Sequence, residues 1–354
     1  MMSSPVSVLL VDDSLIALTI LSRMLSSSPD IQVVGKARSG REALELIPQL
    51  QPAVICTDLH MPDMDGLELT KQIMGRFPRP ILVVSAAVQP EDSHNVFSLL
   101  EAGAIDILPK PRGGLAADDQ RVTQELIRKI KIISGVVALT RRQKKGPDRA
   151  QPQAGPSSPP TPLRPHIVAI GASTGGPQAL RTILAQLPAD FPAPVLCVQH
   201  ISEGFLVGLV DWLATHCVLS VKITESGEQP LPGTIYFPQE GTHLEIDKAG
   251  RLVCAHKAPV DGHRPSVTAT FKSVAEYCGD GAIGVLLTGM GRDGAQGMQD
   301  IFEAGGITIA QNEETSVVFG MPKQAIARGA VKYVLPVQKI ASMLPELLVA
   351  SRRG

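Results

Sequence analysis

Short apolar segments alternate with amphipathic segments through the first third of the chain, and this alternation limits the possible folds more than any other feature. The expected strands are Val6–Val11, Ile31–Val34, Ala53–Thr57, Ile81–Ser85 and Ile105–Leu108, and the segments between them repeat apolar residues at helical spacing. Strands separated by helices pair in parallel, with helices covering both faces of the sheet. The pattern therefore predicts a doubly wound parallel α/β domain.

Polar residues stand where these strands end: Asp12 and Asp13 after the first, Asp58 after the third, Ser85 at the fourth and Lys110 after the fifth. Ligands of open α/β sheets bind at the carboxyl ends of the strands. Three carboxylates there repel one another without a cation, and their hard oxygens suit Mg²⁺. Helix capping explains any single aspartate, but it explains five such residues poorly. We therefore expect a site for Mg²⁺ and a phosphoryl group.

A change of composition divides the chain. Residues 141–165 begin with a basic patch, which we interpret as a solvated helix end, and continue as a Pro/Ser/Gln-rich run. Such a stretch has little apolar area to bury and behaves as a solvated linker. We expect a first domain at 1–130, a linker at 131–164 and a second domain at 165–350.

The second domain opens with a glycine-rich turn after an apolar strand. The strand His166–Ile170 runs into Gly171-Ala172-Ser173-Thr174-Gly175-Gly176. Three interpretations are open from this turn alone. It is a phosphate-binding helix N-terminus, a nucleophile elbow that presents Ser173, or a tight turn of small residues.

The following strands favour the nucleophile. Strand Pro194–Gln199 ends at His200, where a dinucleotide site would have an acidic residue. Neighbouring parallel strands lie about 4.8 Å apart, so His200 is within reach of Ser173. Asp293 follows a further strand, and although alone it would be an ordinary N-cap, with the other two it completes a Ser-His-Asp set.

Other residues of this half have weaker signals. The order Ser…His…Asp differs from that of α/β-hydrolases, so that fold is not implied. Backbone N–H groups around Gly289–Gly291 are candidates for an oxyanion hole. His263 and Arg264 stand in a loop, where they either line the substrate cleft or brace the loop.

The first domain resembles a two-component receiver domain over about residues 5 to 130. The segments that carry the resemblance are Val11-Asp12-Asp13-Ser14, Asp58-Leu59-His60-Met61-Pro62-Asp63-Met64-Asp65-Gly66, Ser85-Ala86 and Lys110-Pro111. The resemblance implies a flavodoxin-like (βα)5 fold in which Asp58 is phosphorylated. It also implies Mg²⁺ bound by Asp12, Asp13, Asp58 and the backbone carbonyl of His60, with Ser85 and Lys110 holding the phosphoryl group. Ile107 departs from the family, which often has an aromatic switch residue at this position.

The second domain resembles the catalytic domain of the chemotaxis protein-glutamate methylesterases, from about Pro165 to Ala350. The matching segments are the Ser173 turn, Val198-Gln199-His200, Gly262-His263-Arg264-Pro265-Ser266-Val267, Leu287-Thr288-Gly289-Met290-Gly291, Asp293-Gly294, Ala310-Gln311-Asn312 and Val318-Phe319-Gly320-Met321-Pro322. The resemblance implies a doubly wound, mainly parallel α/β esterase domain. It places Ser173, His200 and Asp293 on the catalytic triad and Met290 on a backbone oxyanion donor, with Thr174 as a second candidate. No cofactor is expected for the esterase step.

Together the resemblances imply a phosphorylation-activated hydrolase. Its substrates would be methylated glutamates, and specific glutamines, of methyl-accepting chemoreceptors, and its phosphodonor a chemotaxis histidine kinase. The rival hypothesis is a phospho-dependent adaptor whose second half binds a partner without catalysis. A DNA-binding regulator is a weaker third.

Composition and the lack of targeting signals argue against nucleic-acid binding and membrane insertion. The formal net charge of -1 and the 3% of aromatic residues argue against nucleic-acid binding. Five cysteines without a C-x-x-C pair, no signal peptide and no long apolar run indicate a cytoplasmic protein that does not insert into membranes. The mixed surface indicates a monomer.

Overall fold

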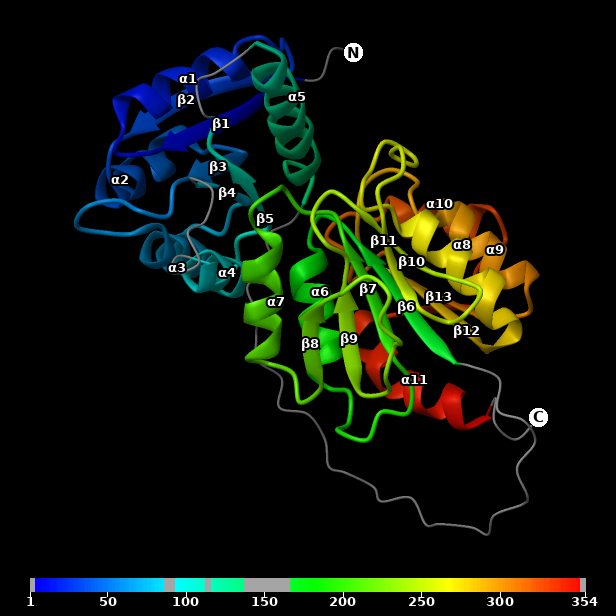
Figure 1. The fold of residues 1–354 in the computed structure, drawn as a ribbon. Coiled ribbons are helices and arrows are strands. Elements are labelled where there is room, and N and C mark those ends of the chain that lie inside the picture. The colour runs from blue at the N-terminus through cyan, green and yellow to red at the C-terminus, as the bar shows by residue number, and fades with distance from the viewer. Residues whose placement is uncertain (1–3, 86–92, 112–115, 137–165, 351–354) are drawn as a thin grey trace, which may run out of the picture.

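The described residues form two large parallel sheets and one small antiparallel pair of strands (Figure 1). The computed structural model describes residues 4–85, 93–111, 116–136 and 166–350. The expected linker therefore lies mostly outside the described residues, although helix α5 continues to Ile133. The domain boundaries stay a prediction.

The first sheet has the strand order β2-β1-β3-β4-β5, with every neighbouring pair parallel. Its elements are β1 Val6–Val11, α1 Leu15–Leu25, β2 Ile31–Ala37, α2 Gly40–Leu50, β3 Val54–Thr57, α3 Gly66–Arg76, β4 Ile81–Ser85, α4 Ser93–Ala102, β5 Asp106–Pro109 and α5 Ala116–Ile133. This order confirms the predicted doubly wound receiver fold, and β1 lies at the point where the strand order reverses. The carboxyl ends of β1 and β3 are therefore neighbours.

The second sheet has the order β14-β13-β12-β6-β7-β9-β8 and is parallel throughout. Its strands are β6 Ile167–Ala172, β7 Val195–Gln199, β8 Ser220–Ile223, β9 Thr234–Phe237, β12 Ala282–Leu286, β13 Ile307–Gln311 and β14 Tyr333–Leu335. The strands β10 His243–Ile246 and β11 Leu252–Ala255 form a separate antiparallel pair. The second domain is therefore mainly parallel, as predicted.

Helices cover both faces of the second sheet. They are α6 Gly176–Leu184, α7 Leu206–Ala214, α8 Val267–Cys278, α9 Ala295–Glu303, α10 Met321–Ala327 and α11 Val337–Ala350, with a short 3-10 turn at Gly279–Gly281. Strand β6 contributes side chains to the cores on both faces of the sheet, because successive side chains of a strand point to opposite faces. Val168 and Ile170 pack in the core with α6, α7 and α11, whereas Ile167 and Ala169 pack with α8, α9 and α10.

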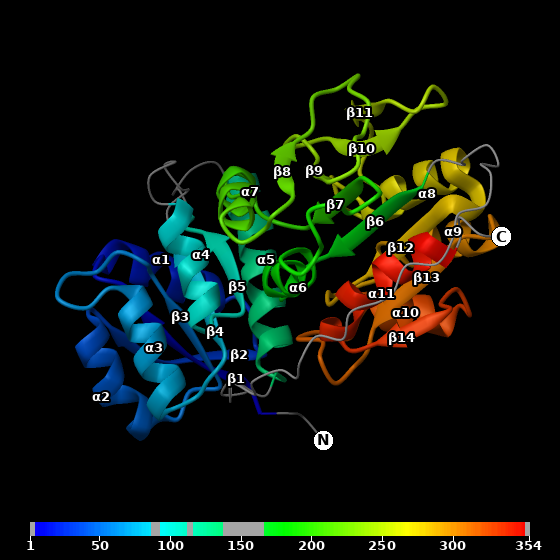
Figure 2. The ribbon, with the colours of Figure 1, turned by 90° about the horizontal axis from the view of Figure 1, so that it is seen from below.

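The two sheets share a continuous apolar core through helices α4 and α7, which lie side by side (Figure 2). The rings of Phe97 and Trp212 stack there with centroids 5.6 Å apart. Helix α4 also contacts α6. In the described part of the chain, no helix combines the length and the apolar character needed to span a bilayer.

Candidate functional site

The acidic residues and the lysine of the first sheet lie together just after the carboxyl ends of β1, β3 and β5. Asp12 and Asp58 are 1% and 6% exposed, and Lys110 Nζ lies 2.7 Å from an oxygen of each. Asp13 is exposed, but its carboxylate lies within 4.8 Å of the other two. Ser85 is buried at the end of β4, and its carbonyl accepts a 2.7 Å hydrogen bond from the Lys110 backbone. His60 is exposed in the loop that follows Asp58.

Burial and charge set the protonation of this site. Burial raises the pKa of Asp58, and the charge of Asp12 adds to that rise, while Lys110 opposes it. Burial lowers the pKa of Lys110, but its hydrogen bonds to Asp12 and Asp58 outweigh burial and leave that pKa raised. Three carboxylates within 4.8 Å of one another offer the hard oxygens that Mg²⁺ prefers. The donor set therefore fits the implied metal.

The second site lies where the strand order of the second sheet reverses, around β6. Ala172 is in register with Gln199 on the neighbouring strand, so Ser173 and His200 follow at adjacent strand tips. The His200 backbone donates to Ala172 O at 3.0 Å. The Ser173 backbone donates to Thr288 O at 3.0 Å, which ties the turn to the end of β12.

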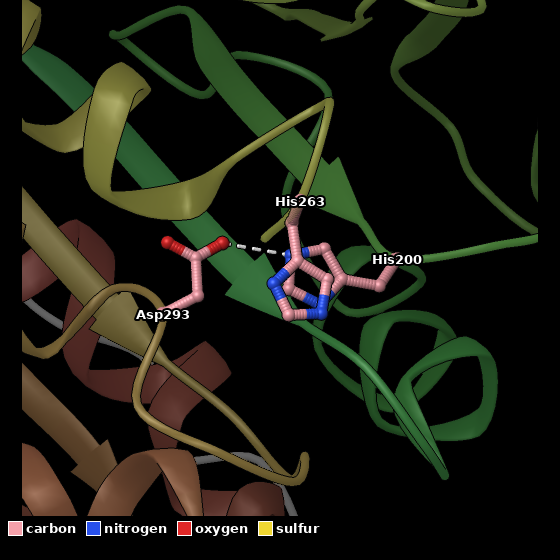
Figure 3. Close-up of side chains that lie close together, drawn as sticks. All are labelled: His200, His263 and Asp293. Atoms are coloured by element: carbon pink, nitrogen blue, oxygen red, sulfur yellow. Dashed lines mark hydrogen bonds and ion pairs between the residues drawn. The ribbon is translucent and has the colours of Figure 1, made fainter. Parts of the chain in front are cut away.

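Asp293 orients the ring of His200. His200 Nε2 lies 2.8 Å from Asp293 Oδ2, and Asp293 is fully buried (Figure 3). The carboxylate also accepts hydrogen bonds from Ser266 Oγ, Val267 N, Thr268 N and Gly294 N, at 2.7 to 2.9 Å. Burial alone would raise the pKa of Asp293. The hydrogen bond of His200 and its charge when protonated, together with the hydrogen bonds from Thr268 and Ser266, instead hold the pKa of Asp293 well below its usual range.

Asp293 does not cap the helix that follows it, as the sequence had left open, because α9 begins after Gly294 without a side-chain cap. It accepts the N–H groups at the start of α8, where the helix dipole favours an anion. It also faces His200. Because an ionised carboxylate only accepts hydrogen bonds, the proton of the neutral His200 ring is on Nε2, and Nδ1 is the basic atom.

His200 Nδ1 is buried and has no hydrogen-bond partner in the described part of the chain. A hydrogen bond from the Ser173 hydroxyl is therefore absent from this arrangement, although the two residues occupy neighbouring strand tips. Such bonds are often long in the absence of substrate and tighten when it binds. Nδ1 is thus the atom available to Ser173.

Close packing fixes the turn that carries Ser173. A Cβ on Gly289 would lie 2.3 Å from Met321 Sδ and 2.7 Å from Ser173 Cβ, so no larger residue fits there unchanged. Gln199, which the sequence analysis did not single out, donates through Nε2 to Ser173 O and His200 O, each at 2.8 Å. A buried amide directly before a candidate base was the available signal.

The predicted oxyanion donors lie beside Ser173. Thr174 follows it and is buried, and Met290 follows Gly289, which packs on Ser173. Within the described residues, the backbone N–H groups of Thr174 and Met290 donate to no other group. Both are therefore free to donate to a substrate oxygen.

His263 lies in this site as well, and the sequence had left its role open. Its ring stacks on that of His200, with centroids 4.0 Å apart and planes 4° from parallel (Figure 3). A ring nitrogen of each histidine and an Asp293 oxygen lie within 4.8 Å of one another. Lone pairs in two parallel ring planes do not converge on one ion, so this trio does not fit a metal.

A parallel sheet with an acidic pocket, joined to a second parallel sheet with serine, histidine and aspartate at its strand tips, defines a response regulator with a hydrolase-type output domain. The comparisons give the family. Residues 168–344 match the CheB methylesterase family model, and residues 8–117 match the response regulator receiver domain. The chain belongs to the CheB methylesterase family.

Relatives match nearly the whole chain. A protein-glutamate methylesterase/protein-glutamine glutaminase of Syntrophus aciditrophicus is 43% identical, over 97% of this chain and 98% of its own length. One of Geobacter metallireducens is 40% identical, over 97% and 99%. The catalytic domain of Thermotoga maritima CheB methylesterase superposes with a TM-score of 0.51 at 40% identity, covering 52% of this chain and 100% of that domain.

Proposed function

We propose that this chain hydrolyses methyl esters of glutamate side chains in methyl-accepting chemoreceptors and deamidates specific receptor glutamines. The relatives are named for both reactions. The observation that carries the proposal is the His200–Asp293 pair, which leaves a free basic nitrogen beside the turn that presents Ser173.

The reaction follows from this geometry. Ser173 Oγ attacks the ester carbonyl carbon while its proton passes to His200 Nδ1. Asp293 stays ionised because its pKa is low, and it stabilises the imidazolium through Nε2–H. The N–H groups of Thr174 and Met290 stabilise the oxyanion. The imidazolium then protonates the methoxide oxygen as its bond to the carbonyl carbon breaks, methanol leaves, and water attacks the acyl-enzyme by the same route to give glutamate.

The receiver would regulate access to Ser173. Val317 packs against the buried cluster that includes the α5 side chains of the first sheet. A Cβ on Gly175, in the nucleophile turn, would lie 2.6 Å from Val317. The charge of Arg128 on α5 also lowers the pKa of His263, although less than burial does. These contacts support a receiver that covers the esterase cleft when it is unphosphorylated.

Phosphorylation of Asp58 would release this cover. Asp12, Asp13, Asp58 and the His60 carbonyl would hold Mg²⁺, which supplies positive charge for phosphoryl transfer. Lys110 and Ser85 would then bind the new phosphoryl group and shift the receiver toward a second state. Couplings of about 1–3 kcal/mol change activity roughly 5- to 150-fold. Ile107 in β5 stands where the family often has an aromatic switch residue, so the shift would proceed without an aromatic flip.

The remaining parts of the proposal concern the setting. The phosphodonor would be a chemotaxis histidine kinase, and the protein would act in the cytoplasm as a monomer. The receiver match supports a kinase as partner. We retain 1–130, 131–164 and 165–350 as the receiver, linker and esterase.

The test is methanol release from methylated receptor membranes, with and without a small-molecule phosphodonor and Mg²⁺. Release should rise with the donor in the wild type, stay basal in Asp58→Ala and vanish in Ser173→Ala. Release that ignores the donor would reject the regulatory part. No release while Asp58 is still phosphorylated would favour the adaptor.

A further inference from the structure

The hydrogen bond of His263 fixes its tautomer, and the stacking fixes which part of its ring faces His200. His263 Nδ1 lies 2.9 Å from the carbonyl oxygen of Asp261. A carbonyl only accepts hydrogen bonds, so Nδ1 carries the proton. The face of the His263 ring, rather than either nitrogen, is turned to His200.

The surroundings keep His263 neutral. Burial lowers its pKa to about 4, and the charges of Arg128 and of His200 when protonated act in the same direction, against Asp293 and the Asp261 carbonyl. The Asp261 side chain is paired with Arg292 at 2.8 Å. At neutral pH His263 therefore presents an uncharged aromatic face.

An uncharged face suits the change that His200 undergoes. His200 becomes a cation each time it takes the Ser173 proton, and a cation over an aromatic face is attracted by the ring electrons. Contact over the whole ring at 4.0 Å also restricts rotation of the imidazole. Rotation would break the 2.8 Å bond from Nε2 to Asp293 and turn Nδ1 away from Ser173.

We propose that His263 is a positioning residue that acts through His200: its neutral ring fixes the plane of the imidazole and stabilises the imidazolium. This inference rests on the proposed esterase mechanism. It assigns the aromatic face as the working part of His263, and it makes the hydrogen bond to Asp261 dispensable for the reaction.

Three substitutions separate the face from the hydrogen bond. His263→Phe keeps an aromatic face, His263→Leu keeps much of the bulk without it, and His263→Ala removes both; all three lose the bond to Asp261. The exposed His256 provides a matched control, His256→Ala. Rates and KM would be measured for methanol release between pH 5 and 9.

The Phe variant should keep kcat within about twofold, whereas Leu and Ala should lower it about tenfold at unchanged KM. The acid limb of kcat/KM should move to lower pH in Leu but not in Phe, because the imidazolium has lost its stabilising face. Equal losses in Phe and Leu would overturn the proposal in favour of loop bracing, and so would unchanged rates in Leu.

A second readout does not depend on turnover. The ring protons of His200, followed by NMR in the resting protein, should titrate at lower pH in the Leu variant than in the wild type and the Phe variant. An unchanged titration would overturn the stacking inference, even in an active enzyme. A shifted titration in a protein that releases no methanol would reject the esterase and leave the stacking intact.

Discussion

Glu101, on helix α4 of the receiver, accepts a 2.8 Å hydrogen bond from Arg181 Nη1 on helix α6 of the second sheet. The same carboxylate oxygen lies 2.8 Å from His216 Nε2 and 3.3 Å from Trp212 Nε1. One side chain of the receiver thus joins α4 to both α6 and α7, around the Phe97–Trp212 stack. Its removal is the most direct test of how the two sheets communicate.

We expect Glu101→Ala to raise basal methanol release without phosphodonor about three- to tenfold, because a partly exposed charge cluster of this kind contributes about 1 kcal/mol. Release in the presence of donor should change little. Glu45→Ala, on the exposed face of α2, is the matched control. Unchanged basal release in Glu101→Ala would show that this cluster does not hold the receiver in place.

Gly289→Ala should displace Ser173, since the new methyl group would meet both Met321 Sδ and Ser173 Cβ. We expect kcat to fall at least tenfold and stability to fall by about 1–3 kcal/mol. Gly75→Ala, in α3 with open space around the added methyl group, is the control and should be neutral or stabilising. Kinetics and urea unfolding of both variants check this, and full activity of Gly289→Ala would contradict the close packing.

Asp293→Asn should keep the size of the side chain but remove the charge that orients His200. An amide is able to donate to Nε2 and so favours the wrong tautomer, with the proton on Nδ1. We expect kcat to fall by about 10³–10⁴. A fluorophosphonate probe should label Ser173 correspondingly slowly, while circular dichroism stays native. Near-normal labelling would remove Asp293 from the mechanism.

The titration of His263 should lower the free energy of unfolding as the pH falls from 6.5 to 4. Its pKa is about 4 in the folded protein against 6.5 for an unperturbed ring, so the unfolded chain binds the extra proton in this window. Solvent screening of the partly exposed ring reduces the full effect, and we expect about 2 kcal/mol. His263→Phe should lose less stability than the wild type between these pH values. Equal losses, measured by denaturant unfolding, would mean that His263 titrates normally.

Mg²⁺ should stabilise the receiver, because it binds the folded acidic pocket and not the unfolded chain. Millimolar Mg²⁺ should raise the melting temperature of the wild type by a few degrees, and EDTA should reverse the rise. Asp13→Asn is the informative variant, since Asp13 is exposed and its loss should leave the fold intact. A rise of the same size in Asp13→Asn would place Mg²⁺ elsewhere.

Local sequence patterns were sufficient to predict the first sheet, the strands β6, β7 and β12 of the second sheet, and the polar residues that follow them. The period of apolar residues distinguishes strands from helices, and parallel pairing brings the carboxyl ends of neighbouring strands together. Asp12 and Asp58, and likewise Ser173 and His200, could be expected to lie close for this reason alone. The clash at Gly289 was not predictable, because it depends on Met321 from a different element.

Contacts between distant parts of the chain were decided only by the tertiary structure. The nitrogen of His200 that faces Asp293 is set by a hydrogen bond between residues 93 positions apart in the sequence. The Glu101–Arg181 contact joins residues 80 positions apart. The stack of His263 on His200 depends on how the loop before α8 docks. Backbone periodicity determines where a side chain begins, whereas its rotamer and its partners are determined by packing against elements that the local sequence does not specify.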